Sequence, residues 1–274
     1  NFQRDKANID IEGGVMTVPE VFGSNFNLGL SNLASMCHAS PSHQWEAIIS
    51  GHFESILEGN RFEQSLKNII TDFSAISKYL AVRIWPKSHA QSLPEDKLIY
   101  REDIEDTITT LVLDLPTSVR SLSMEEAGGW NISLDELFRL GMENVFNNYE
   151  VEVSEEDLNG CKCCLVTGEH MFTATFALSP DWFRKYIGKY GAIVGIPHRH
   201  ALIVCPINGI EAVGGINVLI QAAYGMNRKG PGPVSPNIYW YSGGIYRKLP
   251  YEVSEGKFSF YPPVEFINLL TRMA

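Results

Sequence analysis

The sequence predicts an α+β fold in which a mixed, mainly antiparallel sheet is packed by amphipathic helices. Apolar residues recur every three or four positions in several long segments, which is typical of helices with one buried face. Short runs rich in Val, Ile and Thr are bounded by proline or glycine, which indicates strands. Hairpins and helices follow one another without a repeating strand–helix unit, and this order favours α+β over a parallel α/β sheet.

The chain is long enough for one large domain or two compact halves. It has 274 residues, of which 45% are hydrophobic, so it can bury a complete core. We expect an N-terminal α+β half with a helical hairpin in residues 1–118 and a C-terminal α+β half in residues 119–274. One continuous domain is the alternative.

The N-terminal half is expected to begin with strands and a pair of helices. Residues 8–18 predict two short strands around a turn at Gly13 and Gly14. Ser40 and Pro41 are typical of a helix start. Two apolar stripes follow, and each predicts one helix of a buried hairpin. The stripes are formed by Trp45, Ile48, Ile49, His52, Phe53, Ile56 and Leu57, and by Phe62, Leu66, Ile69, Ile70, Phe73, Ile76 and Leu80.

Two further segments of this half are expected to be strands. Residues 80–85 and 107–115 are rich in Val, Ile, Leu and Thr, and each is followed by a proline, which cannot donate to a strand ladder. Asp114 interrupts the second segment between two leucines. Because strand residues alternate between two faces, we expect Asp114 to lie on the solvated face.

The C-terminal half contains the clearest local signal, a helix start before residue 134. Ser133 and Glu136 have the spacing of a capping box, in which each side chain accepts a hydrogen bond from the other residue's backbone amide. The sequence therefore predicts a helix over residues 134–147. The helix dipole explains the acids of its first turn, so they need no catalytic role.

Residues 168–206 are the most informative part of the chain. Alternation over residues 171–178 predicts a strand, and Ser179 and Pro180 are typical of a helix cap and first turn. A second strand should follow, and a third should begin at the basic cluster His198, Arg199 and His200. A basic cluster between two apolar runs is unusual, so we look there first for a functional site.

The cluster allows two interpretations. On a strand, His198 and His200 would project from one face, where they could ligate a metal or share a proton, and Arg199 would project from the other. No nearby residue completes a known zinc spacing. Arg199 could bind an anion or carboxylate through its planar guanidinium group. The alternatives are structural histidines at the edge of a strand and an ordinary salt bridge for Arg199.

The last part of the chain adds three candidate ligand-binding residues. Residues 210–226 predict a buried helix, and a loop rich in glycine and proline follows over residues 228–236. It leads into an aromatic strand, and a final helix should start at residues 262–263. Such a loop could line a ligand pocket, or it could be a simple crossover. The candidates here are Arg228, Tyr239 and Tyr241.

The five cysteines form an odd, irregularly spaced set, which favours free thiols and a reducing compartment. Cys161, Cys163 and Cys164 lack the C-x-x-C loop of a zinc site, and on a strand Cys164 would face away from the other two. The sequence therefore predicts no metal, and no other cofactor motif is present.

Charge and hydropathy limit the possible partners. The chain has 32 acidic and 22 basic side chains, a net charge of −10 and no run of Lys or Arg, which argues against a nucleic acid or an anionic membrane as partner. No apolar stretch approaches the roughly 20 residues that span a bilayer, and the first ten residues do not resemble a signal peptide. We therefore expect a cytoplasmic location, although a leader could have preceded Asn1.

Several segments resemble the YtpQ-type proteins of bacteria, a family without an established activity. The resemblance is spread over nearly the whole chain and consists of loose motifs. It implies a bacterial cytoplasmic protein and brings no catalytic residues with it. The segments that carry it are LGLSNLASMC, HQWEAIISGHFESIL, LAVRIWP, LVLDLP, SLDELFRLGMENV, FTATFAL and VGIPHRHALIV.

Two classes of function are compatible with these observations. The first is a binding or protein-interaction module that recognises a protein or a small anion. The second is a hydrolase-like enzyme that uses His198 or His200 as general base, since imidazole titrates near neutral pH. The chain contains no G-x-S-x-G, H-E-x-x-H, P-loop or G-x-G-x-x-G motif, and this absence favours the binding module.

Overall fold

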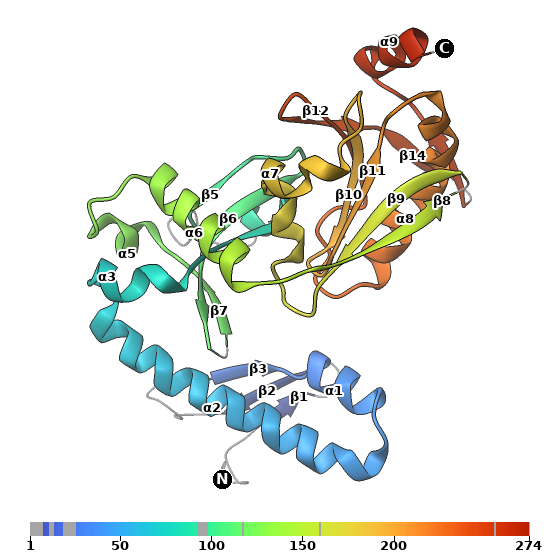
Figure 1. Cartoon of the computed structure of the whole chain (residues 1–274). Helices are drawn as coiled ribbons and strands as arrows, with labels where there is room; N and C mark the ends of the chain where they lie inside the picture. The colour runs from blue at the N-terminus through green and yellow to red at the C-terminus, as the bar shows by residue number, and fades with distance from the viewer. Residues whose placement is uncertain are drawn as a thin grey trace. The chain divides into compact units, whose positions relative to one another are not determined.

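The computed structural model of the chain has an α+β fold with several antiparallel sheets, as the sequence predicts (Figure 1). It describes residues 8–10, 14–18, 26–91, 98–116, 118–158, 160–254 and 256–273. The chain separates into two compact units, residues 1–68 with 116–118 and residues 69–115 with 119–274. This division lies near residue 68, whereas the sequence suggests a division at residue 118. None of the helices described is long and apolar enough to cross a membrane.

The first unit contains a small antiparallel sheet and a long helix. The sheet has the order β1-β2-β3, and the two strands expected over residues 8–18 are β1 and β2. Gly13, at their turn, lies outside the described residues. Side chains of the long helix contact Met16 and Leu28 of the sheet through Phe53 and Ile56. The elements are β1 (Asn8–Asp10), β2 (Val15–Val18), β3 (Phe26–Gly29), α1 (Ser31–His38), η1 (Ser42–Gln44) and α2 (Trp45–Ile69), where η denotes a 3₁₀ helix.

The predicted helical hairpin is wrong, because α2 is one continuous helix of 25 residues. Gly59, in the middle of α2, costs about 1 kcal/mol relative to alanine, which weakens a helix without ending it. The apolar stripe is also less buried than expected. Trp45 is 42% exposed and Ile49 is 38% exposed, so the N-terminal part of the stripe faces solvent.

The second unit begins with a four-stranded antiparallel sheet in which β6 pairs with β4, β5 and β7. Both predicted strands, β4 and β6, are confirmed. Helix α6 packs on β4, where Asn144 donates to the carbonyl oxygen of Leu80 at 2.8 Å. The elements are α3 (Phe73–Ile76), η2 (Ser77–Tyr79), β4 (Leu80–Pro86), α4 (Ser88–Gln91), β5 (Tyr100–Arg101), β6 (Thr107–Leu115), β7 (Ser118–Ser121), α5 (Met124–Gly128) and α6 (Leu134–Asn148).

The predicted helix over residues 134–147 is α6, but its cap differs from the prediction. Ser133 accepts from the amide of Glu136 at 3.3 Å, as expected for an N-cap. The carboxylate of Glu136 pairs with Arg139 instead of returning to the cap. A complete capping box occurs one helix earlier, where the amide of Ser123 donates to Glu126 at 3.0 Å.

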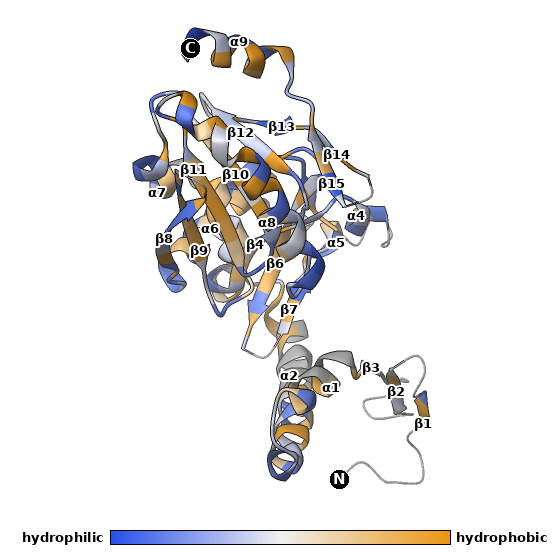
Figure 2. Cartoon of the chain, turned by 90° about the vertical axis from the view of Figure 1, so that its right-hand side faces the viewer, coloured by the Kyte–Doolittle hydropathy of each residue, from blue (hydrophilic) through white to orange (hydrophobic). Residues whose placement is uncertain are grey.

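The rest of the second unit contains a two-stranded antiparallel sheet, β14-β15, and a six-stranded antiparallel sheet of order β13-β12-β10-β11-β9-β8. Figure 2 shows hydrophobic residues along its central strands. Helices α8 and α9 cover one face, and η4 and residues of β4 and β6 pack against the other. The elements are β8 (Glu152–Leu158), β9 (Cys161–Thr167), η4 (Thr173–Leu178), α7 (Pro180–Phe183), η5 (Arg184–Tyr186), β10 (Ala192–His198), β11 (Ala201–Pro206), η6 (Ile210–Gly215), α8 (Ile216–Lys229), β12 (Ile238–Ser242), β13 (Ile245–Leu249), β14 (Tyr251–Ser254), β15 (Lys257–Phe260) and α9 (Val264–Met273).

The strand predicted over residues 171–178 is wrong, because most of this segment is the 3₁₀ helix η4. The alternation did not mark two different faces, since Thr173–Ala177 are all buried. Thr175 donates from its hydroxyl to the carbonyl of Val82 at 3.0 Å, which attaches η4 to the four-stranded sheet. The cap that follows is confirmed, because Ser179 accepts from the amide of Trp182 at 3.3 Å.

The helix expected over residues 210–226 consists of η6 followed by α8. A Cβ atom added to Gly215 would lie 2.4 Å from the Cβ of Cys161, so only glycine fits at this position. A close backbone approach is therefore present at Gly215. It brings the start of α8 against the β8–β9 turn.

The expectation of five free thiols is wrong for two cysteines. Cys163 on β9 and Cys205 on β11 form a disulfide, with Cα atoms 4.1 Å apart. The two strands pair directly, so residues far apart in the sequence become neighbours that spacing alone could not reveal. A chain with a disulfide no longer favours a reducing compartment, and the cytoplasmic location stays a prediction. The free cysteines are Cys37, Cys161 and Cys164.

Candidate anion-binding site

The basic cluster forms a hairpin turn and not the start of a strand. His198 ends β10, Arg199 and His200 form the turn, and Ala201 opposite His198 begins β11. The predicted alternation of faces is therefore wrong. The two imidazole rings still lie near each other, with centroids 6.4 Å apart.

Contacts from other segments hold this turn. The amide of Arg199 donates to the carbonyl of Gly232 at 3.1 Å, and the carbonyl of Arg199 accepts from the amide of Ala174 at 3.2 Å. Gly232 has a φ of +65°, and a Cβ there would lie 2.8 Å from Cδ of Arg199. Two-residue hairpin turns usually require residues with positive φ, but neither Arg199 nor His200 has one. The glycine- and proline-rich loop and η4 thus impose the turn's conformation.

Hydrogen bonds fix the tautomers of both histidines in the turn. The Nδ1 atom of His200 lies 2.9 Å from the carbonyl oxygen of Gly168, so Nδ1 carries the proton. Its Nε2 atom then accepts from Nε of Arg199 at 2.9 Å. The Nδ1 atom of His198 accepts from the amide of His200 at 3.3 Å, which leaves the proton on Nε2. In their neutral forms, His200 therefore carries its proton on Nδ1 and His198 carries its proton on Nε2.

The electrostatic surroundings keep His198 neutral as well. Burial lowers the pKa of His198, and the charges of His200 and Arg199 lower it further. A neutral His198 can donate one hydrogen bond from Nε2 to a ligand. Among the described residues, no hydrogen-bond partner is found for this atom.

A third histidine, His170, extends the basic cluster from the segment before η4. Its Nε2 atom lies 2.9 Å from the carbonyl oxygen of Glu150, and its Nδ1 accepts from the amide of Phe172 at 3.2 Å. Burial lowers the pKa of His170, and His200 adds to the effect, while the nearby carboxylate of Asp114 opposes it. Both ring nitrogens of His170 are therefore occupied by the backbone.

Asp114 is not on a solvated polar face, contrary to expectation. It is half-buried and accepts from the hydroxyl of Tyr149 at 2.5 Å. Burial raises the pKa of Asp114, and the bond from Tyr149 partly offsets this. Its contact is with a phenol, and no ion pair of Asp114 with an arginine is found among the described residues.

Arg83 on β4 is the most unusual charged residue of the second unit. Arg83 is only 5% exposed, and its Nε atom is buried without a hydrogen-bond partner. Nη1 donates to the sulfur of Met171 at 3.4 Å, and the guanidinium carbon lies 3.6 Å from the centroid of the Trp85 ring. No carboxylate pairs with Arg83 among the residues described. Burial and the charge of Arg199 lower the pKa of Arg83 to about 10.

Two half-buried side chains, Trp85 and His89, stack in succession beside Arg83. Trp85 stacks on the ring of His89, with centroids 4.1 Å apart and planes at 8°. Burial lowers the pKa of His89, and the charge of Arg83 adds to this. Trp85 itself is fixed by a hydrogen bond from its indole nitrogen to Thr110 at 3.1 Å.

Arg101 on β5 belongs to the same sheet as Arg83 and has similar neighbours, but it also has a counterion. It too contacts an aromatic ring and a methionine sulfur, with its guanidinium carbon 4.5 Å from the centroid of Phe138 and Nη2 3.9 Å from the sulfur of Met142. Its Nε, however, pairs with Asp103 at 2.9 Å. Arg83 also contacts an aromatic ring and a methionine sulfur, but no carboxylate pairs with it among the described residues.

The structure separates the six candidates from the sequence. His198, Arg199 and His200 lie together in the turn. Tyr239 is fully buried, and its hydroxyl donates to the carbonyl of Glu105 at 2.9 Å. Tyr241 packs in the core against Phe183 and Tyr246, and Arg228 is exposed on the last turn of α8 near Tyr224.

Sequence reasoning missed Arg83, although a signal was present. The residue interrupts the apolar run of β4 between Val82 and Ile84. A charged residue in such a run is either solvated or held in a buried polar site. The electrostatic contact between Arg83 and Arg199, 116 positions apart, depends on how the two sheets are joined.

No family model, no curated protein and no solved structure matches the chain. The resemblance to the YtpQ-type family therefore stays a prediction.

Proposed function

We propose that the chain is a binding module that recognises a small oxyanion, a phosphate or carboxylate group, at Arg83 and Arg199. The observation that carries the proposal is the burial of Arg83 without a carboxylate partner among the described residues. A buried charge that has lost its partner costs a protein about 3–5 kcal/mol. A bound anion would remove that cost and provide the missing partner.

The free donors around Arg83 suit an oxyanion. Arg199 uses Nε for His200, and its two Nη atoms form no hydrogen bond or ion pair with a described residue. A planar guanidinium group binds two oxygens of one carboxylate or phosphate at once. His198 can add a neutral donor from Nε2. Since the chain has a net charge of −10, it is unusual that neither Arg83 nor Arg199 pairs with a carboxylate among the described residues.

The same geometry supports binding over the hydrolase alternative. A general base needs an imidazole nitrogen that can take up a proton from a substrate. Both nitrogens of His200 are occupied, and the unprotonated nitrogen of His198 accepts from a backbone amide. The turn therefore presents donors to a ligand, and its acceptor nitrogens face groups of the chain and not a substrate.

Substitution of Arg199 tests this proposal. We expect inorganic phosphate to bind the purified chain in isothermal titration calorimetry, and Arg199→Ala to weaken binding by about tenfold or more, because hydrogen bonds to charged groups contribute about 1.5–3 kcal/mol. Arg199→Lys should have an intermediate affinity for phosphate, since an ammonium group keeps the positive charge but cannot bind two oxygens at once as a planar guanidinium group does.

Arg228→Ala is the matched control for these variants. It removes an exposed arginine of the same unit, for which no hydrogen bond or ion pair with the turn is found among the described residues, so phosphate affinity should stay unchanged. Equal losses in the Arg199 and Arg228 variants would indicate only a general effect of charge. Wild-type affinity in a folded Arg199→Ala chain would contradict the proposal.

Anion binding should strengthen as the pH falls. Burial and neighbouring positive charges lower the pKa values of His170 and His198 below the ordinary value of about 6.5. A bound anion favours the charged form and raises these pKa values, so binding takes up protons in this range. We expect sulfate, which keeps its charge here, to bind more tightly at pH 5.5 than at pH 7.5.

Calorimetry in two buffers of different ionisation enthalpy measures this proton uptake directly. The carboxylate of Asp114 is the acidic group acting on His170, so Asp114→Asn separates its titration from that of the histidines. A sulfate affinity independent of pH, with no uptake of protons, would show that the histidines do not face the anion.

A further inference from the structure

The disulfide belongs to a group of three sulfur atoms on the other face of the six-stranded sheet. Cys161 and Cys163 share one face of β9, and Cys205 lies beside them on β11. The three Sγ atoms lie within 4.8 Å of one another, and those of Cys161 and Cys163 are 4.0 Å apart. All three residues are at most 4% exposed.

We propose that the reduced chain binds one monovalent copper ion through Cys161, Cys163 and Cys205. Soft thiolate ligands select copper(I) over hard cations that prefer oxygen. Within the described residues, no carboxylate or imidazole joins this group. A structural zinc site takes four ligands, so three sulfurs alone suit it less well. The spacing of the cysteines suggested no metal because the third ligand comes from a distant strand.

The distances between the sulfur atoms agree with a three-coordinate site. Three sulfurs at about 2.3 Å from one ion, arranged at equal angles around it, lie about 4.0 Å apart. The pair Cys161 and Cys163 already has this separation. Opening the bond between Cys163 and Cys205 would let their sulfurs move apart by about 2 Å, within reach of side-chain rotation.

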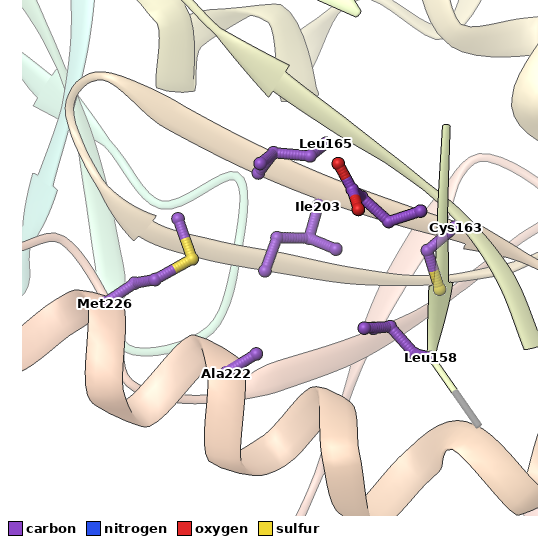
Figure 3. Close-up of a pocket in the computed structure, with 7 residues that line it drawn as sticks. Leu158, Cys163, Leu165, Ile203, Ala222 and Met226 are labelled. Atoms are coloured by element: carbon purple, nitrogen blue, oxygen red, sulfur yellow. The ribbon is translucent and has the colours of Figure 1, made fainter. Parts of the chain in front are cut away.

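A cavity of about 80 Å³ lies next to Cys163, between the sheet and α8. Figure 3 shows Ile203 and Cys163 on the strand side and Ala222 and Met226 on the helix. The cavity gives the ion space to approach the thiolates.

Reduction is required before the metal can bind. A phosphine donates two electrons to the disulfide, the S–S bond breaks, and the two sulfurs take up two protons from water while the water oxygen ends on phosphorus. The three thiols then lose their protons to the buffer as they bind copper(I). The oxidised chain keeps two of the three ligands in the disulfide.

Titration with copper(I) against a coloured chelator under argon tests the proposal. After reduction by a phosphine and its removal, the full chain should bind one copper(I) ion, and X-ray absorption at the copper edge should show only sulfur neighbours. The oxidised chain should bind none with comparable affinity. Binding of zinc in preference to copper(I), or no binding by a reduced and folded chain, would overturn the assignment.

Serine variants identify the ligands. Cys161→Ser, Cys163→Ser and Cys205→Ser should each weaken binding by more than about 100-fold, because even outer-shell changes cost 10–100-fold in metal affinity. Cys164→Ser is the matched control, since this residue lies next to Cys163 on the opposite face of β9. If a serine variant fails to fold, the alanine variant of the same residue replaces it. Equal loss in the control would overturn the assignment.

Discussion

Replacing Arg83 with leucine is expected to abolish anion binding without unfolding the chain. Two hydrogen bonds from a guanidinium group to an oxyanion contribute about 3 kcal/mol or more, so affinity for sulfate should fall by more than about 100-fold. Stability without anion should stay equal or rise, because hydrophobic replacement of buried charges is often neutral or stabilising by about 1–4 kcal/mol. Loss of the contact with Trp85, worth up to about 2 kcal/mol, offsets part of this gain.

Thermal melting in sulfate and in chloride at equal ionic strength measures both effects. Sulfate stabilises most proteins by exclusion from their surface, and this contribution is the same in the variant and the wild type. Specific binding adds a stabilisation that depends on ligand concentration and that only the wild type should show. Melting temperatures of wild type and Arg83→Leu that rise equally with sulfate would contradict the proposed site.

Arg101→Leu is the matched control for Arg83→Leu. It removes an arginine with the same kinds of contact from the same sheet, but one whose charge is already paired with Asp103. We expect Arg101→Leu to keep the extra stabilisation by sulfate. A loss of stability in Arg83→Leu that exceeds the loss in Arg101→Leu would mean that Arg83 is a structural residue.

The largest loss of stability is expected from Phe176→Ala in η4. Phe176 is 2% exposed and contacts Phe146 and Trp182 at ring-centroid distances of 5.2 and 5.1 Å. Truncation of a large core residue to alanine costs about 3–5 kcal/mol, because it removes buried surface and leaves a cavity. Urea unfolding followed by tryptophan fluorescence measures the change in the free energy of unfolding of this unit.

Phe73→Ala provides the comparison. The sequence pattern suggests a core position for both Phe73 and Phe53, but the structure shows that both are only half-buried. Phe73 contacts Trp130 at 5.5 Å, so its truncation should cost clearly less than that of Phe176. A loss from Phe176→Ala no larger than that from Phe73→Ala would show that η4 is not part of the folded core.

The extent to which the fold was predictable varies with the kind of signal. The long periodic segment over residues 134–147 and the β-rich runs over residues 80–85 and 107–115 were predicted correctly, because local sequence determines such elements. The 3₁₀ helix η4 was not predicted. Its residues 173–177 are all buried, so the alternation of apolar residues carries no information on which face is buried. The continuous α2 was missed because the apolar pattern breaks between Leu57 and Phe62, and a break in the pattern does not by itself end a helix.

The site was predictable only in part, for a related reason. The basic cluster stands out in the sequence, so Arg199 could be proposed as an anion ligand from the residues alone. Its turn geometry could not, because contacts from Gly232 and Ala174 impose it. Arg83 and Cys205 have their roles through neighbours more than 40 positions away, and spacing carries no information on such neighbours.

The positions of Arg83 and Arg199 depend on η4, which also packs in the core of the second unit. This 3₁₀ helix contacts the Arg199 turn through Ala174 and the four-stranded sheet through Thr175, and Met171 just before it contacts Arg83. A local opening of η4 would therefore release both arginines from their supports in one event. Arg83 and Arg199 would then lose their positions together when η4 opens. An anion bound to both arginines would therefore also suppress the opening of η4, although it does not contact η4.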